Sequence, residues 1–181
     1  MTLTGGATAG ASASDGNFAL LTSAGKQDIT ASSIAVQGGS AVQLVTDGDI
    51  SSAQIQAGTS QNIISSGAIT VAAGGGAGHS VARIASDASQ SISAGSMAIV
   101  GGAVGSSNQA SVSSNVAQTV TVKNALLIQG GAGENNGAGL VLGGATDATQ
   151  TVNAGTLTVQ GDLLVIIISR NWKCQASEST S

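Results

Sequence analysis

The stretch "QSISAGSMAIVGG", residues 90–102, decides the fold. Its apolar residues fall at every second position, as at Ile92 and then at Met97 and Ile99, which is the period of a strand that shows one face to a core. The Gly and Ser clusters would interrupt a helix every few residues, whereas Val, Ile and Thr suit a pleated surface. The stretch contains no acid, base or metal ligand. It therefore predicts short strands separated by a small-residue turn and ended by Gly-Gly.

The same pattern occurs five times along the chain. The copies align on a glutamine, and successive glutamines are 34, 29, 28 and 32 residues apart. The residue two positions after each glutamine is Ile or Val in every copy. Such self-similarity is the signature of a repeat architecture. We therefore expect ten structural repeat positions: Gln27, Gln61, Gln90, Gln118 and Gln150, with Ile29, Ile63, Ile92, Val120 and Val152.

A third sub-motif, A-x-[ILV]-x-[AS], precedes each glutamine. Its alanine stands eight positions before the glutamine in four copies, and the fifth copy, beginning at Ala138, inserts four residues. Each repeat thus reads as three short strands and a glycine-rich loop of variable length. One such coil cannot bury its own apolar row, but stacked coils bury a continuous core. The sequence predicts an all-β protein, a parallel β-helix (β-solenoid) of about five coils of 28–34 residues with three short strands per coil.

Composition agrees with a long, thin core. The chain is 41% hydrophobic but only 1% aromatic, so small residues must form the interior. Glycine suits the corners, where φ > 0 is often required, and alanine suits a narrow interior. Stacked glutamines at one level of successive coils would form a ladder of side-chain amides. Disorder, which low charge and a high Gly/Ser/Ala content also favour, stays open as an alternative.

Two regions are expected along the chain. Residues 1–162 form the repeat domain, whose first coil is incomplete because "MTLTGG" matches only the last strand and Gly-Gly of a repeat. Residues 163–181 form a divergent C-terminal tail or cap. Leu163–Ile168 is too short to span a bilayer and is expected to be one last strand closing the core, or an aggregation-prone segment if exposed. The first residues do not resemble a signal peptide, so a secreted parent would carry its signal outside this chain.

No catalytic, cofactor-binding or metal-binding residue is predicted. His79, in "GGGAGHSVARI", stands where other copies place Asn or a small residue, so we interpret it as a solvated loop histidine. Cys174 is the only cysteine, so neither an internal disulfide nor a zinc cluster can form. Low charge, at 8% with a net of −4, and the absence of interleaved aromatics argue against nucleic acid as a partner.

Two chemical roles have weaker support in the sequence than a structural role. "GGAGENNGAG" from Gly130 offers Glu134, Asn135 and Asn136 and superficially resembles calcium-binding glycine-rich repeats, but it occurs once and lacks their aspartate. An acid pair for glycosidic cleavage could be assembled only from scattered residues such as Asp87, Asp147 and Asp162. We therefore expect no enzymatic activity and no cofactor.

The repeat resembles a known family of exported proteins. The pattern Q-x-[IV]-x-A-G-x-[ILV]-x-V-x-GG, seen best in "QSISAGSMAIVGG" and "QTVNAGTLTVQGD", is similar to the repeats of bacterial exoproteins of the filamentous haemagglutinin type. The resemblance covers residues 1 to 162. It implies a right-handed parallel β-helix shaft, exported through an outer-membrane partner transporter and used in adhesion, biofilm cohesion or display of a terminal domain. The family's amino-terminal secretion domain is absent, and the coils are longer than its commonest repeat.

The expected function is that of a structural segment of a secreted or cell-surface adhesin-like protein, a rigid stalk or contact surface. Its partners would be neighbouring coils of a longer parent and a surface receptor or glycan that the sequence does not name. Contact specificity is expected in the variable loops. The alternative is a subunit of a self-assembling amyloid-like extracellular fibre that associates through open coil ends. A third hypothesis, ice or mineral binding, rests on threonine rows in "AITV", "TVTV" and "TLTV", but "SIAV" and "MAIV" break the row.

Overall fold

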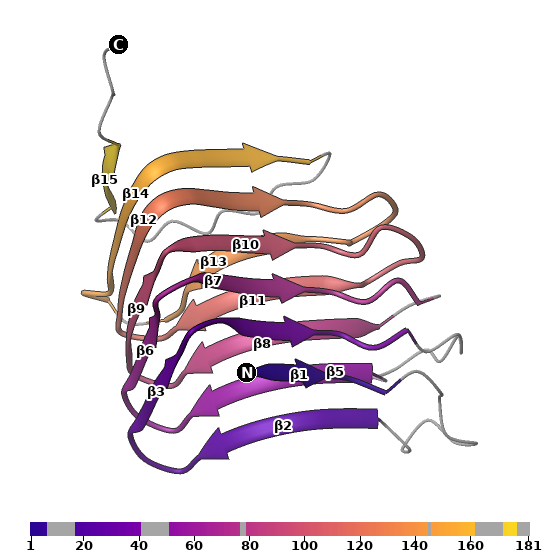
Figure 1. The fold of residues 1–181 in the computed structure, drawn as a ribbon, viewed down its shortest axis with the longest axis horizontal. Helices are drawn as coiled ribbons and strands as arrows, with labels where there is room; N and C mark the ends of the chain where they lie inside the picture. Colours follow the sequence, from indigo (N-terminus) through magenta and orange to yellow (C-terminus); the bar gives the residue numbers. More distant parts are fainter. Residues whose placement is uncertain (7–16, 41–50, 77–78, 145, 162–171, 177–181) are drawn as a thin grey trace.

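The protein is a parallel β-solenoid (Figure 1). The structure, a computed structural model, describes residues 1–6, 17–40, 51–76, 79–144, 146–161 and 172–176. Within these ranges the chain forms fifteen strands and no helix, and the strand pairings are parallel. The strands stack coil upon coil in about five turns. The predicted all-β class and the predicted architecture are both confirmed.

The first strands of the coils form one sheet of five. The alanines of the A-x-[ILV] sub-motif pair with one another in register, Ala19 with Ala53 and onward to Ala138, as their alignment in the sequence predicts. The members in spatial order are β2 (Asn17–Ser23), β5 (Ser51–Ala57), β8 (Ser80–Ser86), β11 (Gln109–Ser114) and β13 (Ala138–Leu142).

The second and third strands of the coils share one sheet of ten strands. The second-strand column contains β3 (Gln27–Ala31), β6 (Gln61–Ser65), β9 (Ser89–Ala94), the first parts of β12 (Ala117–Gln129) and β14 (Thr149–Gln160), and β15 (Trp172–Ala176). The third-strand column contains β1 (Thr2–Thr4), β4 (Ile34–Gln37), β7 (Ala68–Ala72), β10 (Ser96–Val100) and the last parts of β12 and β14.

The expectation of three separate strands holds for the early coils but not for the last two. In β12 and β14 the second and third strands are continuous, and their pairing shifts register between Val122 and Ala125. The chain bends at this irregularity without leaving the sheet. The small-residue step of the repeat is therefore a bend in these coils rather than a break.

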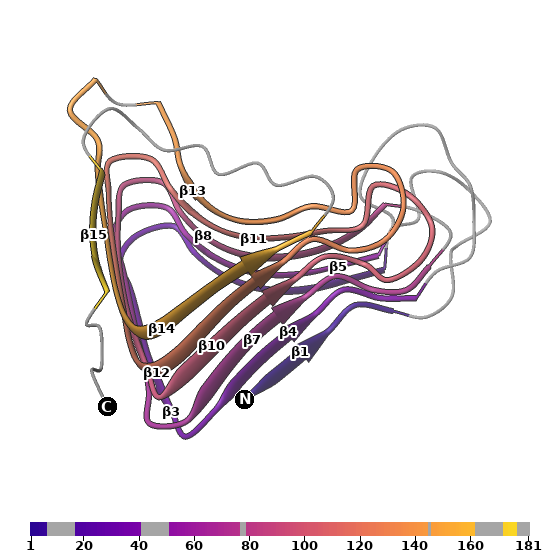
Figure 2. The ribbon, with the colours of Figure 1, turned by 90° about the horizontal axis from the view of Figure 1, so that it is seen from above.

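The core is a set of apolar columns that run along the axis. Viewed along the axis, the coils superpose in a three-sided outline (Figure 2). Ile63 and Ile92 belong to the second-strand column, while Val71 and Ile99 belong to the third, and all four side chains are buried. Alternation of apolar and polar residues places these side chains inward and their neighbours outward.

The Gly-Gly pairs mark a corner where successive coils approach closely. A Cβ atom at Gly74 would collide with the carbonyl oxygen of Gly39, and one at Gly102 would lie 2.7 Å from the carbonyl oxygen of Gly74. Gly131 has the same relation to Gly102. None of these glycines has a positive φ, so space rather than backbone conformation requires glycine here. Glycines with φ > 0, which the sequence predicts at corners, occur at other positions: Gly105, Gly133, Gly144 and Gly161.

The two ends extend the columns. β1 pairs with β4, with Leu3 opposite Val36, so "MTLT" forms a third strand as its sequence predicts. β15 pairs with the first part of β14, with Trp172 opposite Gln150. The predicted strand Leu163–Ile168 lies outside the described residues.

Candidate functional site: the internal ladders and the outer faces

The five repeat glutamines form a buried ladder of amides. Each side-chain nitrogen donates to the side-chain oxygen of the glutamine one coil earlier, from Gln61 to Gln27 at 2.7 Å and from Gln90 to Gln61 at 2.7 Å. Gln118 donates to Gln90 at 2.8 Å, and Gln150 donates to Gln118 at 2.5 Å. All five side chains are buried. The amide ladder predicted from the repeat is therefore present, and it fixes the register of the coils.

The apolar residues two positions later follow the same register. Ile63, Ile92, Val120 and Val152 are buried one above another in the core. Ile29 packs against this core but is only partly buried, because it lies in the first complete coil. The inward assignment of these positions thus agrees with the structure.

Sequence reasoning missed a second ladder, at the start of the first strands. The side-chain oxygen of Asn108 accepts the backbone N–H of Ser80 at 2.8 Å, and that of Asn136 accepts the backbone N–H of Asn108 at 2.9 Å. The side-chain nitrogen of Asn136 donates to backbone carbonyls, among them those of Gly102 at 3.0 Å and Gly105 at 3.1 Å. These buried amides satisfy the polar backbone of the loops that leave the coil.

A signal for this second ladder was present. The residue two positions before each repeat alanine is Asn or Ser in every copy, namely Asn17, Ser51, Ser80, Asn108 and Asn136. Asn and Ser at one column are the residues that bond to neighbouring backbone groups in place of the strand ladder. This column is harder to recognise than the glutamine column because its residue type varies between Asn and Ser, whereas the glutamine is the same in all five copies.

His79 lies at a tight corner of the coil. It stands three residues before the repeat alanine of its coil, as Ser107 and Asn135 do in theirs, and all three have φ near +59° (58°, 59° and 59°). The backbone N–H of His79 donates to the carbonyl of Ser106, and that of Ser107 donates to the carbonyl of Glu134. The column thus contains Asn or a small residue beside His79, as the sequence indicated.

The three candidate calcium ligands do not point to one side of the loop. Glu134 and Asn135 are exposed, whereas Asn136 is buried and its side-chain oxygen accepts a hydrogen bond from the backbone N–H of Asn108. Among the described residues, no three His, Cys, Asp or Glu side chains gather as a metal site would require.

The candidate acids are spread along one corner. Asp87, between β8 and β9, and Asp147, between β13 and β14, are both exposed and belong to coils two rungs apart. Asp162 lies outside the described residues. Cys174 lies in β15, where its backbone pairs with that of Val152.

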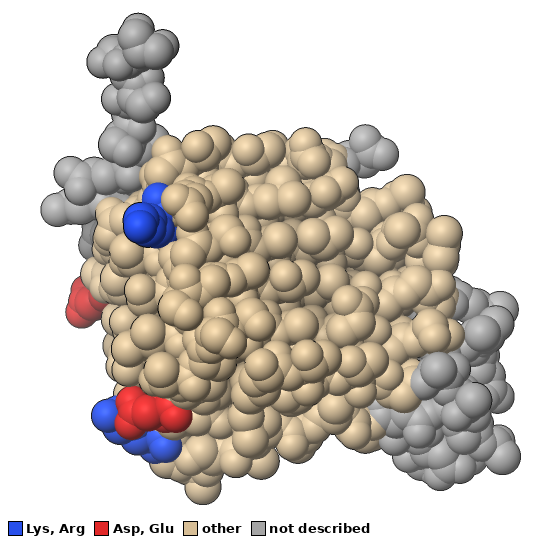
Figure 3. All heavy atoms as spheres, in the orientation of Figure 1, with Lys and Arg blue, Asp and Glu red and all other residues tan. Residues whose placement is uncertain are grey.

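The outer face of the third strands carries no charged residue within the described ranges. Two outward columns cover it in register: Thr2, Ala35, Thr70, Ala98, Leu127 and Thr158 in one, and Thr4, Gln37, Ala72, Val100, Gln129 and Gln160 in the other. Among the residues that the structure describes, the charged side chains visible in this view lie toward one edge (Figure 3). The threonine row is interrupted by Ala35 and Ala98, as "SIAV" and "MAIV" indicated, and also by Leu127.

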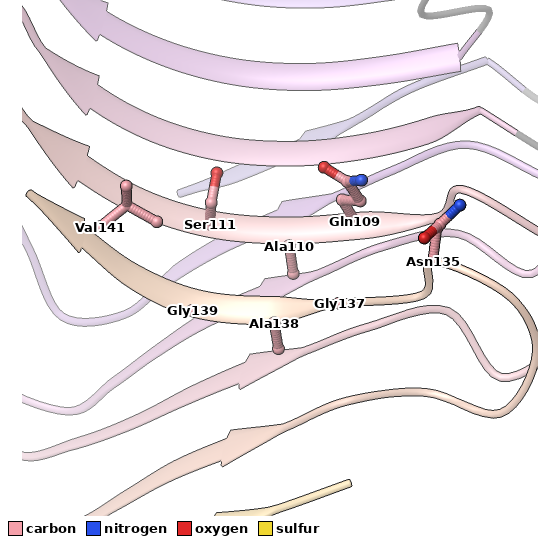
Figure 4. Close-up of a pocket in the computed structure, with 8 residues that line it drawn as sticks. All are labelled: Gln109, Ala110, Ser111, Asn135, Gly137, Ala138, Gly139 and Val141. Atoms are coloured by element: carbon pink, nitrogen blue, oxygen red, sulfur yellow. The ribbon is translucent and has the colours of Figure 1, made fainter. Parts of the chain in front are cut away.

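A shallow groove of about 260 Å³ lies on the outer face of the five-stranded sheet. Gln109, Ser111 and Asn135 project to one side of the strands, while Ala110 and Ala138 point the other way (Figure 4). Gly137 and Gly139 contribute no side chain, and this leaves the hollow over β13.

A second groove, of about 350 Å³, follows the corner between the first and second strands. Hydroxyl and amide side chains line it on successive coils, with one ammonium group at its N-terminal end. The outward residues are Lys26, Ser60, Asn62, Ser89, Ser91 and Thr119. Lys26 forms an exposed ion pair with Asp28 at 2.9 Å.

Comparison with known proteins yielded no match to any family model, curated protein or solved structure. Within the described residues, no helix has the length and apolar character needed to cross a membrane. The assignment of the chain therefore rests on its β-solenoid fold.

Proposed function

We propose that the chain is a structural segment of a secreted or cell-surface adhesin-like bacterial protein, acting as a rigid shaft and contact surface. The observation that carries the proposal is the unbroken glutamine ladder, which joins five coils through hydrogen bonds of 2.5–2.8 Å between buried side-chain amides. A column of buried side chains that are hydrogen-bonded to one another resists both bending and slippage of register. Extracellular location and export through an outer-membrane transporter belong to the same proposal and come from the resemblance of the repeats.

The contact surface we propose is the polar groove along the corner between first and second strands. Its hydroxyl and amide groups recur on successive coils, so a partner with regularly spaced hydroxyls, such as a surface glycan, can bond to several coils at once. Individual contacts of this kind are weak. Their repetition along a stiff shaft supplies the avidity.

Adhesion assays with coated beads test this function. Beads carrying the folded chain should be retained on biofilms or host-cell monolayers more than beads carrying the Ile92→Asp variant, in which the core is disrupted. A variant with Ser60, Ser89 and Ser91 replaced by Ala should keep its β-sheet circular dichroism and lose retention. If beads that carry the folded, unsubstituted chain are retained no better than uncoated beads, the role as a contact surface is refuted and only the role as a rigid shaft remains proposed.

The second candidate function is that of a fibre subunit. The observation in its favour is the set of sheet edges at the N-terminal end, where β2 and β3 each have a partner on one side only among the described strands. Unpaired edges are templates for pairing with another chain. A shaft segment should sediment as one species at all concentrations, whereas a fibre subunit should elongate as its concentration rises.

A further inference from the structure

Asn136, in the second ladder, is followed by Gly137, and this is the only Asn-Gly pair in the sequence. Asn-Gly is the pair most prone to lose the side-chain amide spontaneously. The reason is that glycine has no Cβ to hinder the attack of its backbone nitrogen on the asparagine side chain. Every other asparagine of the chain is followed by a residue that carries a side chain. The sequence thus places its most labile amide in a buried ladder.

Neither space nor backbone conformation requires glycine at position 137. No described atom lies within 4 Å of a Cβ atom added to Gly137, and its φ is not positive. Gly102 differs, because a Cβ there would collide with Asn108 and with the carbonyl oxygen of Gly74. The clearest consequence of glycine at position 137 is therefore chemical, and it falls on the side chain of Asn136.

The fold holds the amide of Asn136 away from this reaction. The residue is 3% exposed, and its side-chain oxygen accepts the backbone N–H of Asn108 at 2.9 Å. Its side-chain nitrogen donates to the carbonyls of Gly102 at 3.0 Å and Gly105 at 3.1 Å. The amide cannot turn toward the backbone nitrogen of Gly137 without breaking these bonds to the preceding coil. Reaction therefore requires local opening of this corner.

We propose that Asn136 is a deamidation site that the folded coil protects and that opening of the corner exposes. In the open state the backbone nitrogen of Gly137 attacks Cγ of Asn136. A bond from that nitrogen to Cγ forms, the bond from Cγ to Nδ2 breaks, and ammonia leaves with the proton of the Gly137 nitrogen. Water then opens the resulting cyclic imide at either carbonyl and gives aspartate or isoaspartate.

Both products oppose closure of the corner at neutral pH. A carboxylate has no proton to donate, so aspartate at position 136 would repel the carbonyl oxygens of Gly102 and Gly105. Isoaspartate adds one atom to the main chain before Gly137, whose carbonyl accepts the backbone N–H of Ala110 at 3.0 Å. That extra atom shifts β13 relative to β11. One opening event followed by reaction thus becomes a permanent change in the second ladder.

Peptide mapping by mass spectrometry tests the site. The chain is incubated at mildly alkaline pH, folded in buffer or unfolded in urea, and the exchange of the amide NH2 for OH is followed at each asparagine. Asn136 should react first in urea and at least about tenfold more slowly in buffer, where it must wait for opening. Gly137→Ala, whose Cβ meets no described atom, should slow the reaction in urea several-fold.

A matched pair of variants tests the protection by the fold. Gly102→Ala crowds the corner that holds Asn136 and should speed its deamidation in buffer. Gly25→Ala, in the turn between β2 and β3, meets no atom within 4 Å and should leave the rate unchanged. In urea the two variants should react alike, because the fold no longer distinguishes them.

Limited proteolysis after long incubation in buffer tests the consequence. Brief digestion should remove deamidated molecules before intact ones, because their corner stays open. These results together would support the proposal. Equal rates in buffer and urea would overturn protection by the fold, and the absence of preferential reaction at Asn136 in urea would overturn the site. Equal digestion of deamidated and intact molecules would overturn the effect on the ladder.

Discussion

The side-chain nitrogen of Gln118 lies 2.8 Å from the side-chain oxygen of Gln90 and 3.2 Å from the carbonyl oxygen of Val112. One N–H thus bonds along the axis to the preceding coil, and the other bonds within its own coil. Gln27 makes the same intracoil contact to Leu21, more loosely, at 3.5 Å. Because both donors find acceptors, the amide can be buried at little cost, whereas an unsatisfied buried donor costs about 1–3 kcal/mol.

Replacing a middle member of this ladder should cost more than replacing its end. Gln90→Leu leaves the oxygen of Gln61 and a donor of Gln118 without partners, so we expect a loss of about 2–5 kcal/mol in the free energy of unfolding. Gln27→Leu removes a single ladder bond and should cost about half as much. Urea unfolding of both variants measures the difference in the free energy of unfolding. Equal losses would show that the number of ladder hydrogen bonds removed does not determine the cost.

A charge in the apolar column should unfold the shaft, whereas the same charge one residue away should not. Ile92 is 1% exposed, while its neighbour Ser91 faces outward from the same strand. Ile92→Asp should cost several kcal/mol because an unpaired carboxylate would be buried. Ser91→Asp should stay within about 0.5 kcal/mol. Thermal unfolding followed by circular dichroism compares the two, and similar melting temperatures would refute the inward assignment.

The glycine column should tolerate no side chain. A Cβ at Gly102 would meet the carbonyl oxygen of Gly74 at 2.7 Å and would also collide with Asn108, so Gly102→Ala should destabilise the protein by about 1–3 kcal/mol. Gly25 has no atom within 4 Å of the added Cβ and no positive φ. Gly25→Ala should therefore be neutral or stabilise by up to about 1 kcal/mol. Denaturant midpoints of the pair provide the measurement.

An acid in the second ladder should make stability depend on pH. Asn136→Asp would place a carboxyl group among the carbonyl oxygens of Gly102 and Gly105, which favour its protonated, donating form. The pKa of that carboxyl should be higher in the folded than in the unfolded chain. The variant should then approach wild-type stability at about pH 4 and lose it as the pH rises through the folded-state pKa. Urea midpoints at acidic and neutral pH test this, and a pH-independent loss would contradict it.

The sequence predicted the columns better than the corners. Alternation at Ile92, Met97 and Ile99, with the glutamine spacing, was sufficient for the strand positions and the first ladder, because both depend on a period of two and on residues that repeat. The continuous strand through Val122 and Ala125 was not predicted, since it depends on how neighbouring coils bend together. The bonds of Asn136 were missed, although its position repeats, because they join the side chain to the backbone of loops whose sequences differ from coil to coil.

The in-register columns also have a genetic consequence. Each coil presents to the next coil the same glutamine and the same alanine that it receives from the previous one. An in-frame duplication or loss of one repeat therefore leaves the amide ladder and the alanine column continuous while it changes the length of the shaft. Selection can adjust how far such a protein reaches through the number of copies, because both columns accept a further copy of the same residue.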